Sequence, residues 1–349
     1  MEFPGMAKRG GRRADKDNSI VLLKQTLTVR FLLLAAIPLL GCSLQAIAET
    51  YPVRPIHIVI PYSPGSPTDI HTRKISDVAQ RKLGVSIVVE NRPGATGVIG
   101  AGFVARAPAD GYTLMATPSE PLIPATVLVQ SVPYDSVKDF RYITKLFLSA
   151  PVLIANSMRG IRTLADLVER SKADPITYAS FGPGSFHQLS LEEFARLANI
   201  HLQEVSYRSP TQAGEAVLAN EVALGYASQS QVLDVSRKDK LVPLAVIGKK
   251  RLQFLPAVPT FAEEGFSTRI LETAFWTGLV APRQIPASIV QTLHRAFYDS
   301  LQDPEIKDYF SRTGNDTVGN TPDAFDKEFR EEYEAITTML RKPQPVPRP

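Results

Sequence analysis

Short apolar runs alternate with segments of helical periodicity along this chain of 349 residues, and this alternation restricts the possible folds more than any other feature. The β-branched run at residues 56–60 ends at Pro61, as a buried strand does. Apolar residues then recur at helical spacing over residues 70–83, and Thr68 or Asp69 is the expected N-cap of that helix. The chain therefore begins its folded part with a strand, a loop and a helix.

The same order continues and then starts again. Strands are expected at residues 87–90 and 112–116, with a helix of small residues between them. A second series has expected strands at 151–155, 176–179, 202–205, 222–227 and 244–247, and expected helices at 163–172, 185–198 and 211–219. A last strand at 275–280 precedes helices at 287–301, 304–310 and 322–340. This order predicts an α/β protein of two lobes, each with a mainly parallel sheet flanked by helices.

The first 48 residues differ from the rest and have the pattern of an export signal. A basic start is followed by an apolar run at residues 31–40, which is shorter than the ~20 residues that a transmembrane helix needs. Two cleavage sites compete: the small-x-small pattern that ends at Ala48, and a lipoprotein-like box that ends at Cys42. We favour release into the periplasm after Ala48, with lipid attachment at Cys42 as the alternative.

Removal of this segment changes the charge of the protein. The whole chain has a formal charge of +4, but residues 1–48 hold seven of the 39 Lys and Arg and three of the 35 Asp and Glu, so that 32 of each sign remain. A neutral mature protein gives no electrostatic reason to expect nucleic acid or an anionic membrane surface as a partner.

Two Gly/Pro/Ser-rich loops lie where a parallel sheet places its ligands, between the carboxyl end of a strand and the following helix. Free N–H groups and the helix dipole favour an anion there. The candidate binding residues are Ser63, Pro64, Gly65, Ser66, Thr68 and Asp69 in the first loop and Ser180, Phe181, Gly182, Gly184 and Ser185 in the second. Such a loop alone is usually only a turn. Equivalent loops in both lobes favour a carboxylate-binding cleft, which Arg208 is also placed to face.

Catalytic and cofactor motifs are weak. The five histidines have no metal-ligand spacing, and no nucleophile elbow or phosphate-binding P-loop occurs, so we expect no enzyme, no metal and no cofactor. Gly100 to Ala105 match a loose dinucleotide pattern, but they lie inside an expected helix, where close packing on the sheet explains the glycines better. The pair Phe275 and Trp276 is interpreted as core.

Several short motifs occur in order along the mature chain. They are Tyr51-Pro52-Val53-Arg54-Pro55-Ile56, Pro64-Gly65 with Thr68-Asp69, Val89-Glu90-Asn91-Arg92-Pro93-Gly94-Ala95, Asp110-Gly111-Tyr112-Thr113-Leu114, Pro133-Tyr134-Asp135, Tyr207-Arg208 and Pro256-Ala257-Val258-Pro259-Thr260. With these motifs the chain closely resembles the Bug-type extracytoplasmic solute receptors of tripartite tricarboxylate transporters, from about Tyr51 to the last helix.

The resemblance implies a type II-like periplasmic binding protein whose two domains close on a small carboxylate or amino-acid-like solute. It implies lobe 1 from residues 51–150 plus 273–341 and lobe 2 from residues 151–272, with a disordered tail at 342–349. It adds Tyr62, Thr117, Ser119 and His187 to the candidate ligand-binding residues. It also implies a membrane permease as partner, with a sensor kinase of a two-component system as the alternative, and we expect a monomer.

The chain departs from the family pattern at both loops. Ser66 and Pro67 replace a run of glycines, and Pro183 precedes Gly184 where a small residue or Asn is usual. Proline removes an N–H donor and stiffens the backbone. These changes leave the predicted fold as it is, but they alter the two loops that hold the usual ligand of the family. An exported hydrolase remains a rival interpretation, because a catalytic set can assemble from distant residues.

Overall fold

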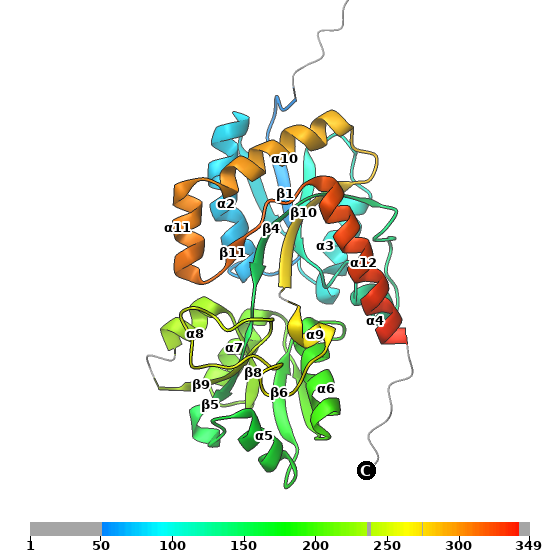
Figure 1. Cartoon of the computed structure of the whole chain (residues 1–349). Helices are drawn as coiled ribbons and strands as arrows, with labels where there is room; N and C mark the ends of the chain where they lie inside the picture. Colours follow the sequence, from blue (N-terminus) through cyan, green and yellow to red (C-terminus); the bar gives the residue numbers. More distant parts are fainter. Residues whose placement is uncertain (1–50, 236–238, 274, 342–349) are drawn as a thin grey trace, which may run out of the picture. The chain divides into compact units, whose positions relative to one another are not determined.

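Two β-sheets organise the described part of the chain, which covers residues 51–235, 239–273 and 275–341 of the computed structural model (Figure 1). The predicted signal segment and the predicted C-terminal tail lie outside these ranges. The six-stranded sheet has the spatial order β11 (Asp316–Thr317), β4 (Phe140–Ser149), β10 (Phe275–Pro282), β3 (Thr113–Pro118), β1 (Ile56–Ile60) and β2 (Ile87–Asn91). The five-stranded sheet has the order β7 (Leu202–Ser206), β6 (Ile176–Ser180), β8 (Leu224–Ala227), β5 (Val152–Asn156) and β9 (Leu241–Val246).

Both sheets are mixed. Strand β1 pairs in parallel with β2 and β3, whereas β10 runs antiparallel to β3 and β4. In the second sheet β6 is parallel to β7 and β8, whereas β5 is antiparallel to β8 and β9. The predicted two-lobed α/β class is confirmed, but the sheets are less parallel than predicted. Two neighbouring strands run parallel when a β-α-β crossover joins them. The strands at which the chain passes from one sheet to the other are not joined in this way, so they pair antiparallel.

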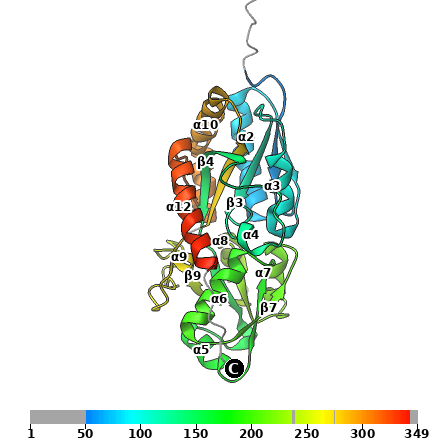
Figure 2. The same ribbon diagram turned by 90° about the vertical axis from the view of Figure 1, so that its right-hand side faces the viewer.

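Helices cover both faces of each sheet (Figures 1 and 2). On the six-stranded sheet, one face packs against α2 (Pro67–Leu83), α10 (Ala287–Leu301) and α11 (Pro304–Thr313), and the other against α3 (Val98–Ala105) and α12 (Pro322–Arg341). On the five-stranded sheet, the faces pack against α5 (Leu164–Ser171) with α6 (Phe186–Ala198), and against α7 (Pro210–Leu218) with α8 (Gln229–Val235). Short helices complete the connections: α4 (Ala125–Leu128), α9 (Arg269–Glu272), and the 3₁₀ turns η1 (Ala95–Gly97) and η2 (Ser157–Arg159).

Helix α2 begins earlier than predicted. Its N-cap is Ser66, whose hydroxyl accepts a hydrogen bond from the Asp69 N–H, and Pro67 is the first helical residue. The prediction of Thr68 or Asp69 as the cap was wrong, because proline is favoured at the first helical position, where its missing N–H costs nothing. The helix ends at Gly84, which adopts the left-handed conformation with φ of 71°.

Strand β4 was not predicted, although it is central to the first sheet. Lys145 interrupts its apolar residues and is nevertheless buried, with its ammonium 2.6 Å from the Glu328 carboxylate. This ion pair, formed with a helix far along the chain, allows a charged residue in a central strand. By contrast, the packing interpretation of the Gly100 motif is confirmed, since a Cβ there would lie 3.0 Å from the Arg92 carbonyl oxygen and 2.9 Å from Pro61.

Among the described residues, no helix is long and apolar enough to cross a membrane. The described residues from 51 onward form one compact unit, so the boundaries given above for the two lobes stay a prediction. The strands nevertheless show where the chain returns: β10, near the C-terminal end of the sequence, lies between β3 and β4.

Gly278 gives a test of the packing between β10 and α12. A Cβ at this position would overlap the ring of Phe325, which is fully buried, at 2.6 Å from its Cε1. We expect Gly278→Ala to lower the free energy of unfolding by about 1–3 kcal/mol, as overpacking of a core does. Gly214→Ala is the matched control, because its Cβ would lie 3.4 Å from the nearest side-chain atom, within a helix that alanine favours. Equal stability of the two variants in urea denaturation would contradict this packing.

Candidate functional site

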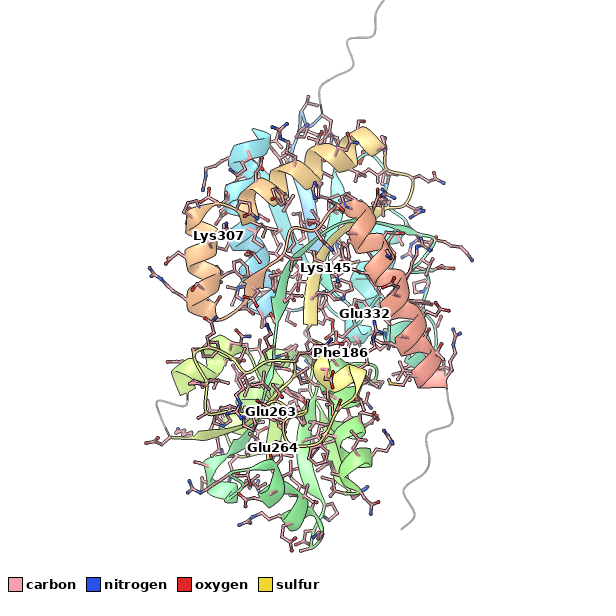
Figure 3. All side chains as sticks on the ribbon, in the orientation of Figure 1. Lys145, Phe186, Glu263, Glu264, Lys307 and Glu332 are labelled. Carbon is pink, nitrogen blue, oxygen red and sulfur yellow. The ribbon has the colours of Figure 1, made fainter. Side chains whose placement is uncertain are left out.

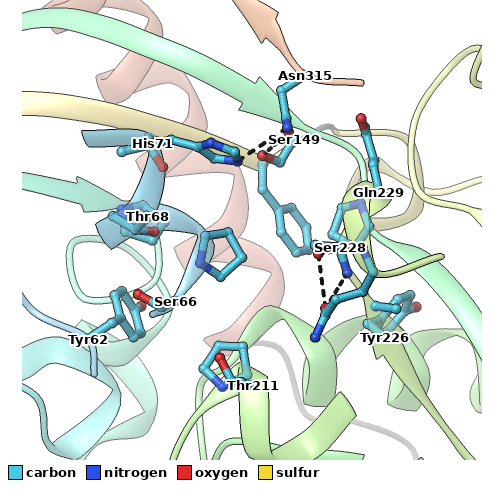
Figure 4. A pocket seen from close by; sticks show the side chains of 18 of the residues that line it. Tyr62, Ser66, Thr68, His71, Ser149, Thr211, Tyr226, Ser228, Gln229 and Asn315 are labelled. Carbon is cyan, nitrogen blue, oxygen red and sulfur yellow. Dashed lines mark hydrogen bonds between the residues drawn. The ribbon is translucent and has the colours of Figure 1, made fainter. Parts of the chain in front are cut away.

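A pocket of about 100 Å³ is lined by residues of both sheets and of the segments that join them. This volume is several times the ~10–15 Å³ that one buried water needs. Figure 4 shows Tyr62, Ser66, Thr68 and His71 on one side and Tyr226, Ser228 and Gln229 on the other. The remaining lining residues include Pro67, Glu120, Phe147, Ser149, Phe181, His187, Pro210, Thr211, Phe275, Thr277 and Asn315.

The first predicted loop contributes part of this lining. Tyr62, Ser66 and Thr68 line the pocket, whereas Ser63, Pro64, Gly65 and Asp69 do not. Pro64 and Gly65 are exposed. The helix N-terminus with its partial positive charge thus lies at the pocket, while the glycine-containing turn lies outside it.

Asp69 has a structural role in this loop. Its Oδ2 accepts a hydrogen bond from the Gly65 N–H at 2.9 Å, and its Oδ1 accepts from Arg73 Nε at 2.9 Å and from Asn91 Nδ2 at 3.0 Å. These bonds hold the loop, the helix and the end of β2 together. Both carboxylate oxygens thus have partners within the protein, and through them Asp69 supports the wall of the pocket.

The second predicted loop uses most of its donors internally. The Gly182 N–H donates to Ser180 Oγ at 3.1 Å, and the Gly184 N–H donates to Gln188 Oε1 at 3.0 Å. Ser185 caps α6, and its hydroxyl accepts from the Gln188 N–H. Of this segment only Phe181 and, in the first turn of α6, His187 line the pocket.

The other predicted residues lie near the pocket without lining it. Thr117 donates its hydroxyl proton to the Pro118 carbonyl, and the Ser119 carbonyl accepts from Leu122 and Ile123 in a turn. Arg208 is exposed, and its backbone N–H donates to Gln212 Oε1. The lining residues next to it are Pro210 and Thr211, which begin α7. Contact of each predicted residue with a ligand stays a prediction.

Several lining residues were missed by sequence reasoning. His71 comes directly after Ile70 in α2, the helix that follows the first loop. Its Nδ1 lies 2.8 Å from the Tyr309 hydroxyl. Its Nε2 lies 3.3 Å from Asn315 Nδ2, so two distant segments fix the ring. The sequence did contain a signal for His71, because this residue lies on the helix that was predicted to follow the first loop. No signal pointed to Asn315, which reaches the site only through the C-terminal return of the chain.

Five buried polar atoms of lining residues have no hydrogen-bond partner among the described residues. They are Tyr62 Oη, Glu120 Oε2, His187 Nδ1, Tyr226 Oη and Gln229 Oε1. Glu120 lies near the Tyr62 hydroxyl and Ser190 lies near Tyr226, but neither pair has the geometry of a hydrogen bond. Buried polar groups in proteins are nearly always paired, so such a cluster marks a place where a solute or water completes the bonding.

Burial controls the charges of the pocket. It lowers the pKa of His71 to about 4 and that of His187 to about 3, so both rings are neutral at pH 7. Burial also raises the pKa of Glu120 to about 7, and the nearby Glu332 carboxylate adds to this effect. No lysine or arginine of residues 51–235, 239–273 and 275–341 lines the pocket. Helix N-termini and N–H dipoles give this part of the pocket a positive potential.

This arrangement is suited to binding a small molecule. Within residues 51–235, 239–273 and 275–341, no group of three or more His, Cys, Asp or Glu side chains could hold a metal ion. The pocket instead offers aromatic rings, hydroxyl and amide groups, and the first turns of α2 and α7. Such a mixture of apolar walls and few convergent polar groups is typical of a small-molecule site.

The chain is similar to proteins of known structure and family. A family model described as "Tripartite tricarboxylate transporter family receptor" matches residues 71–341. Protein BugT of Bordetella pertussis is 32% identical over 81% of this chain and 87% of its own length. The structure of periplasmic binding protein BugD covers 84% of this chain and 98% of its own, with 26% identity and a TM-score of 0.78. MatC from Rhodopseudomonas palustris with bound malate covers 83% and 100%, with 25% identity and a TM-score of 0.77.

The buried carboxyl of Glu120 gives a test of the pocket's electrostatics. Its folded-state pKa is raised from 4.5 to about 7, so the folded protein retains a proton that the unfolded chain loses between these pH values. The stability contributed by this group is present below pH 4.5 and is lost as the pH rises through 7. We expect Glu120→Gln to gain stability over the wild type across this window, reaching roughly 3 kcal/mol above pH 7.

Urea denaturation of the ligand-free proteins from pH 4 to 8 measures this difference. Glu264→Gln is the control, because Glu264 is an exposed carboxylate that does not line this pocket, and its curve should remain parallel to that of the wild type. A pH-independent difference for Glu120→Gln would show that its carboxyl is not buried in the folded protein.

Proposed function

Because the chain belongs to the receptor family of tripartite tricarboxylate transporters, we propose that it captures a small carboxylated solute outside the cytoplasm by closing its two lobes around that solute. The observation that carries this proposal is the pocket lined from both sheets, in which five buried polar atoms lack a partner among the residues that the structure describes. The malate bound to MatC is one carboxylate that a similar structure holds.

The carboxylate is held by backbone dipoles and not by a cationic side chain. Thr68 and Thr211 line the pocket in the first turns of α2 and α7, where N–H groups have no partner within the helix. Charge-assisted bonds from N–H groups in a low-dielectric pocket are strong enough to hold an anion. Since the two helices belong to different sheets, one carboxylate solute draws on both lobes.

Closure follows from this shared binding. The lobes already contact each other beside the pocket: Phe186, Leu189 and Ile270 belong to the apolar cluster on one face of the six-stranded sheet. The rings of Tyr62 and Phe181 lie edge to face with centroids 6.1 Å apart, and Thr96 Oγ1 donates to the Pro183 carbonyl at 2.9 Å. A solute that contacts both sides binds the closed form more tightly, which shifts the population toward it. The closed form then presents one continuous surface to a membrane permease, which we propose as its partner.

Binding and closure can be tested together. Thr211→Trp places a large ring in the pocket and should weaken binding of the carboxylate that most raises the melting temperature by more than about tenfold. Glu215→Trp is the matched control, since Glu215 is exposed on the same helix and does not line the pocket. A thermal-shift screen with malate and other carboxylates identifies the solute, and small-angle scattering measures compaction. Tight binding without compaction would contradict closure.

The site of export processing gives a separate test. We propose cleavage after Ala48, so the protein recovered from the periplasm should begin at Glu49 and lack Cys42. Ala48→Arg should retain the leader, whereas Cys42→Ala should change nothing. Intact mass spectrometry of the exported proteins distinguishes these results. A lipid-modified N-terminus at Cys42 would instead show membrane anchoring.

A further inference from the structure

Glu120 is an unusual residue for the wall of a pocket that receives an anion. Its side chain is 3% exposed, it lines the pocket, and its Oε2 has no hydrogen-bond partner among the described residues. A carboxylate in such a place normally has a cationic partner, because removing a charge from water is costly unless it is paired. Within the described part of the chain, no ion pair satisfies it.

The groups around Glu120 do not supply that partner. Glu332 of α12 is a second buried carboxylate, and its Oε2 accepts a hydrogen bond from Trp276 Nε1 at 2.8 Å. Lys145, labelled with Glu332 in Figure 3, is paired with Glu328 at 2.6 Å. Tyr62 is the other titratable group that acts on Glu120, and burial raises the pKa of its phenol. Glu120 therefore faces the pocket with acidic or neutral groups behind it.

The unpaired atoms also indicate which kind of atom is missing. The Gln229 Nε2 donates to the Ala150 carbonyl at 3.4 Å, which leaves Oε1 as an unpaired acceptor. An ionised Glu120 is also only an acceptor. A solute that carries carboxylates alone offers these atoms no donor, whereas an ammonium group offers three. Donors on a solute would therefore pair with both buried acceptors.

The aromatic lining favours a cation as well. Rings of Tyr62, Phe147, Phe181, Tyr226 and Phe275 line the pocket. The negative face of an aromatic ring attracts an ammonium group, and the attraction is stronger in a site shielded from water. A solute with two carboxylates would face the Glu120 charge, and no lysine or arginine among the described lining residues offsets it.

From this geometry we infer that the solute carries a protonated amine in addition to its carboxylate, and that Glu120 receives the amine as the residue that determines specificity. This inference rests on the proposed function as a solute receptor. The carboxylate occupies the first turns of α2 and α7, and the amine points toward Glu120 and Gln229. The receptor thereby selects an amino acid or a similar zwitterion against the corresponding simple acid.

Pairs of probes that differ only by the amine test this inference. Alanine with propionate, aspartate with succinate, glutamate with glutarate, and phenylalanine with 3-phenylpropionate are compared by titration calorimetry on the mature protein at pH 7.5. We expect the amino member of the best-binding pair to bind at least about 30-fold more tightly than the acid without the amine, as expected for a buried charge pair. Glu120→Gln should remove that preference by weakening the amino member alone.

Controls separate this effect from loss of structure. Glu264→Gln should bind as the wild type does, and Glu120→Asp, which retains the charge on a shorter side chain, should keep part of the preference. Circular dichroism checks that each variant is folded. A simple acid that binds as tightly as its amino counterpart, with no loss in Glu120→Gln, would overturn the inference and leave the receptor function intact. No binding by either member of any pair, nor by other carboxylates, would overturn both.

Discussion

Strand β10 is the element on which the site depends. It returns the C-terminal part of the chain to the first sheet, where it pairs with β3 and β4. Its first residues, Phe275 and Thr277, line the pocket, while Trp276 between them is buried and donates to Glu332. Alternation along one strand thus sends one set of side chains to the solute site and the other to the packing against α12. Core and pocket share this strand, so neither can change without the other.

Local sequence predicts the local elements of this fold well. Runs of β-branched residues and helical periodicity locate β1, α5, α6 and α10 closely, because in each case the pattern repeats over several turns or ends at a proline. Strand β4 was missed because Lys145 breaks its apolar pattern, and its ion pair with Glu328 is formed only in the folded protein. The antiparallel pairings were missed for a related reason, since they depend on how the chain passes between the sheets.

The site was predictable in outline and not in detail. Residues of both strand-to-helix loops line the pocket, but the second loop satisfies N–H groups of its own through Ser180 and Gln188. Sequence alone does not show which donors a loop uses internally. Glu120 and Asn315 were not predicted, because a single acidic or amide residue in a connecting segment has no periodic pattern. Only the three-dimensional convergence of several segments makes them members of one site.

Glu120 connects stability to function in this protein. A carboxyl whose pKa is raised to about 7 by burial makes the ligand-free protein less stable at neutral pH than a neutral side chain would. The unpaired Gln229 Oε1 and His187 Nδ1 add to that cost. A solute that supplies the missing donors recovers this free energy only when both lobes contact it. The same unpaired groups that destabilise the empty pocket therefore become the source of differential affinity for the closed form. Replacing them by well-packed apolar residues would stabilise the fold and remove the driving force for closure.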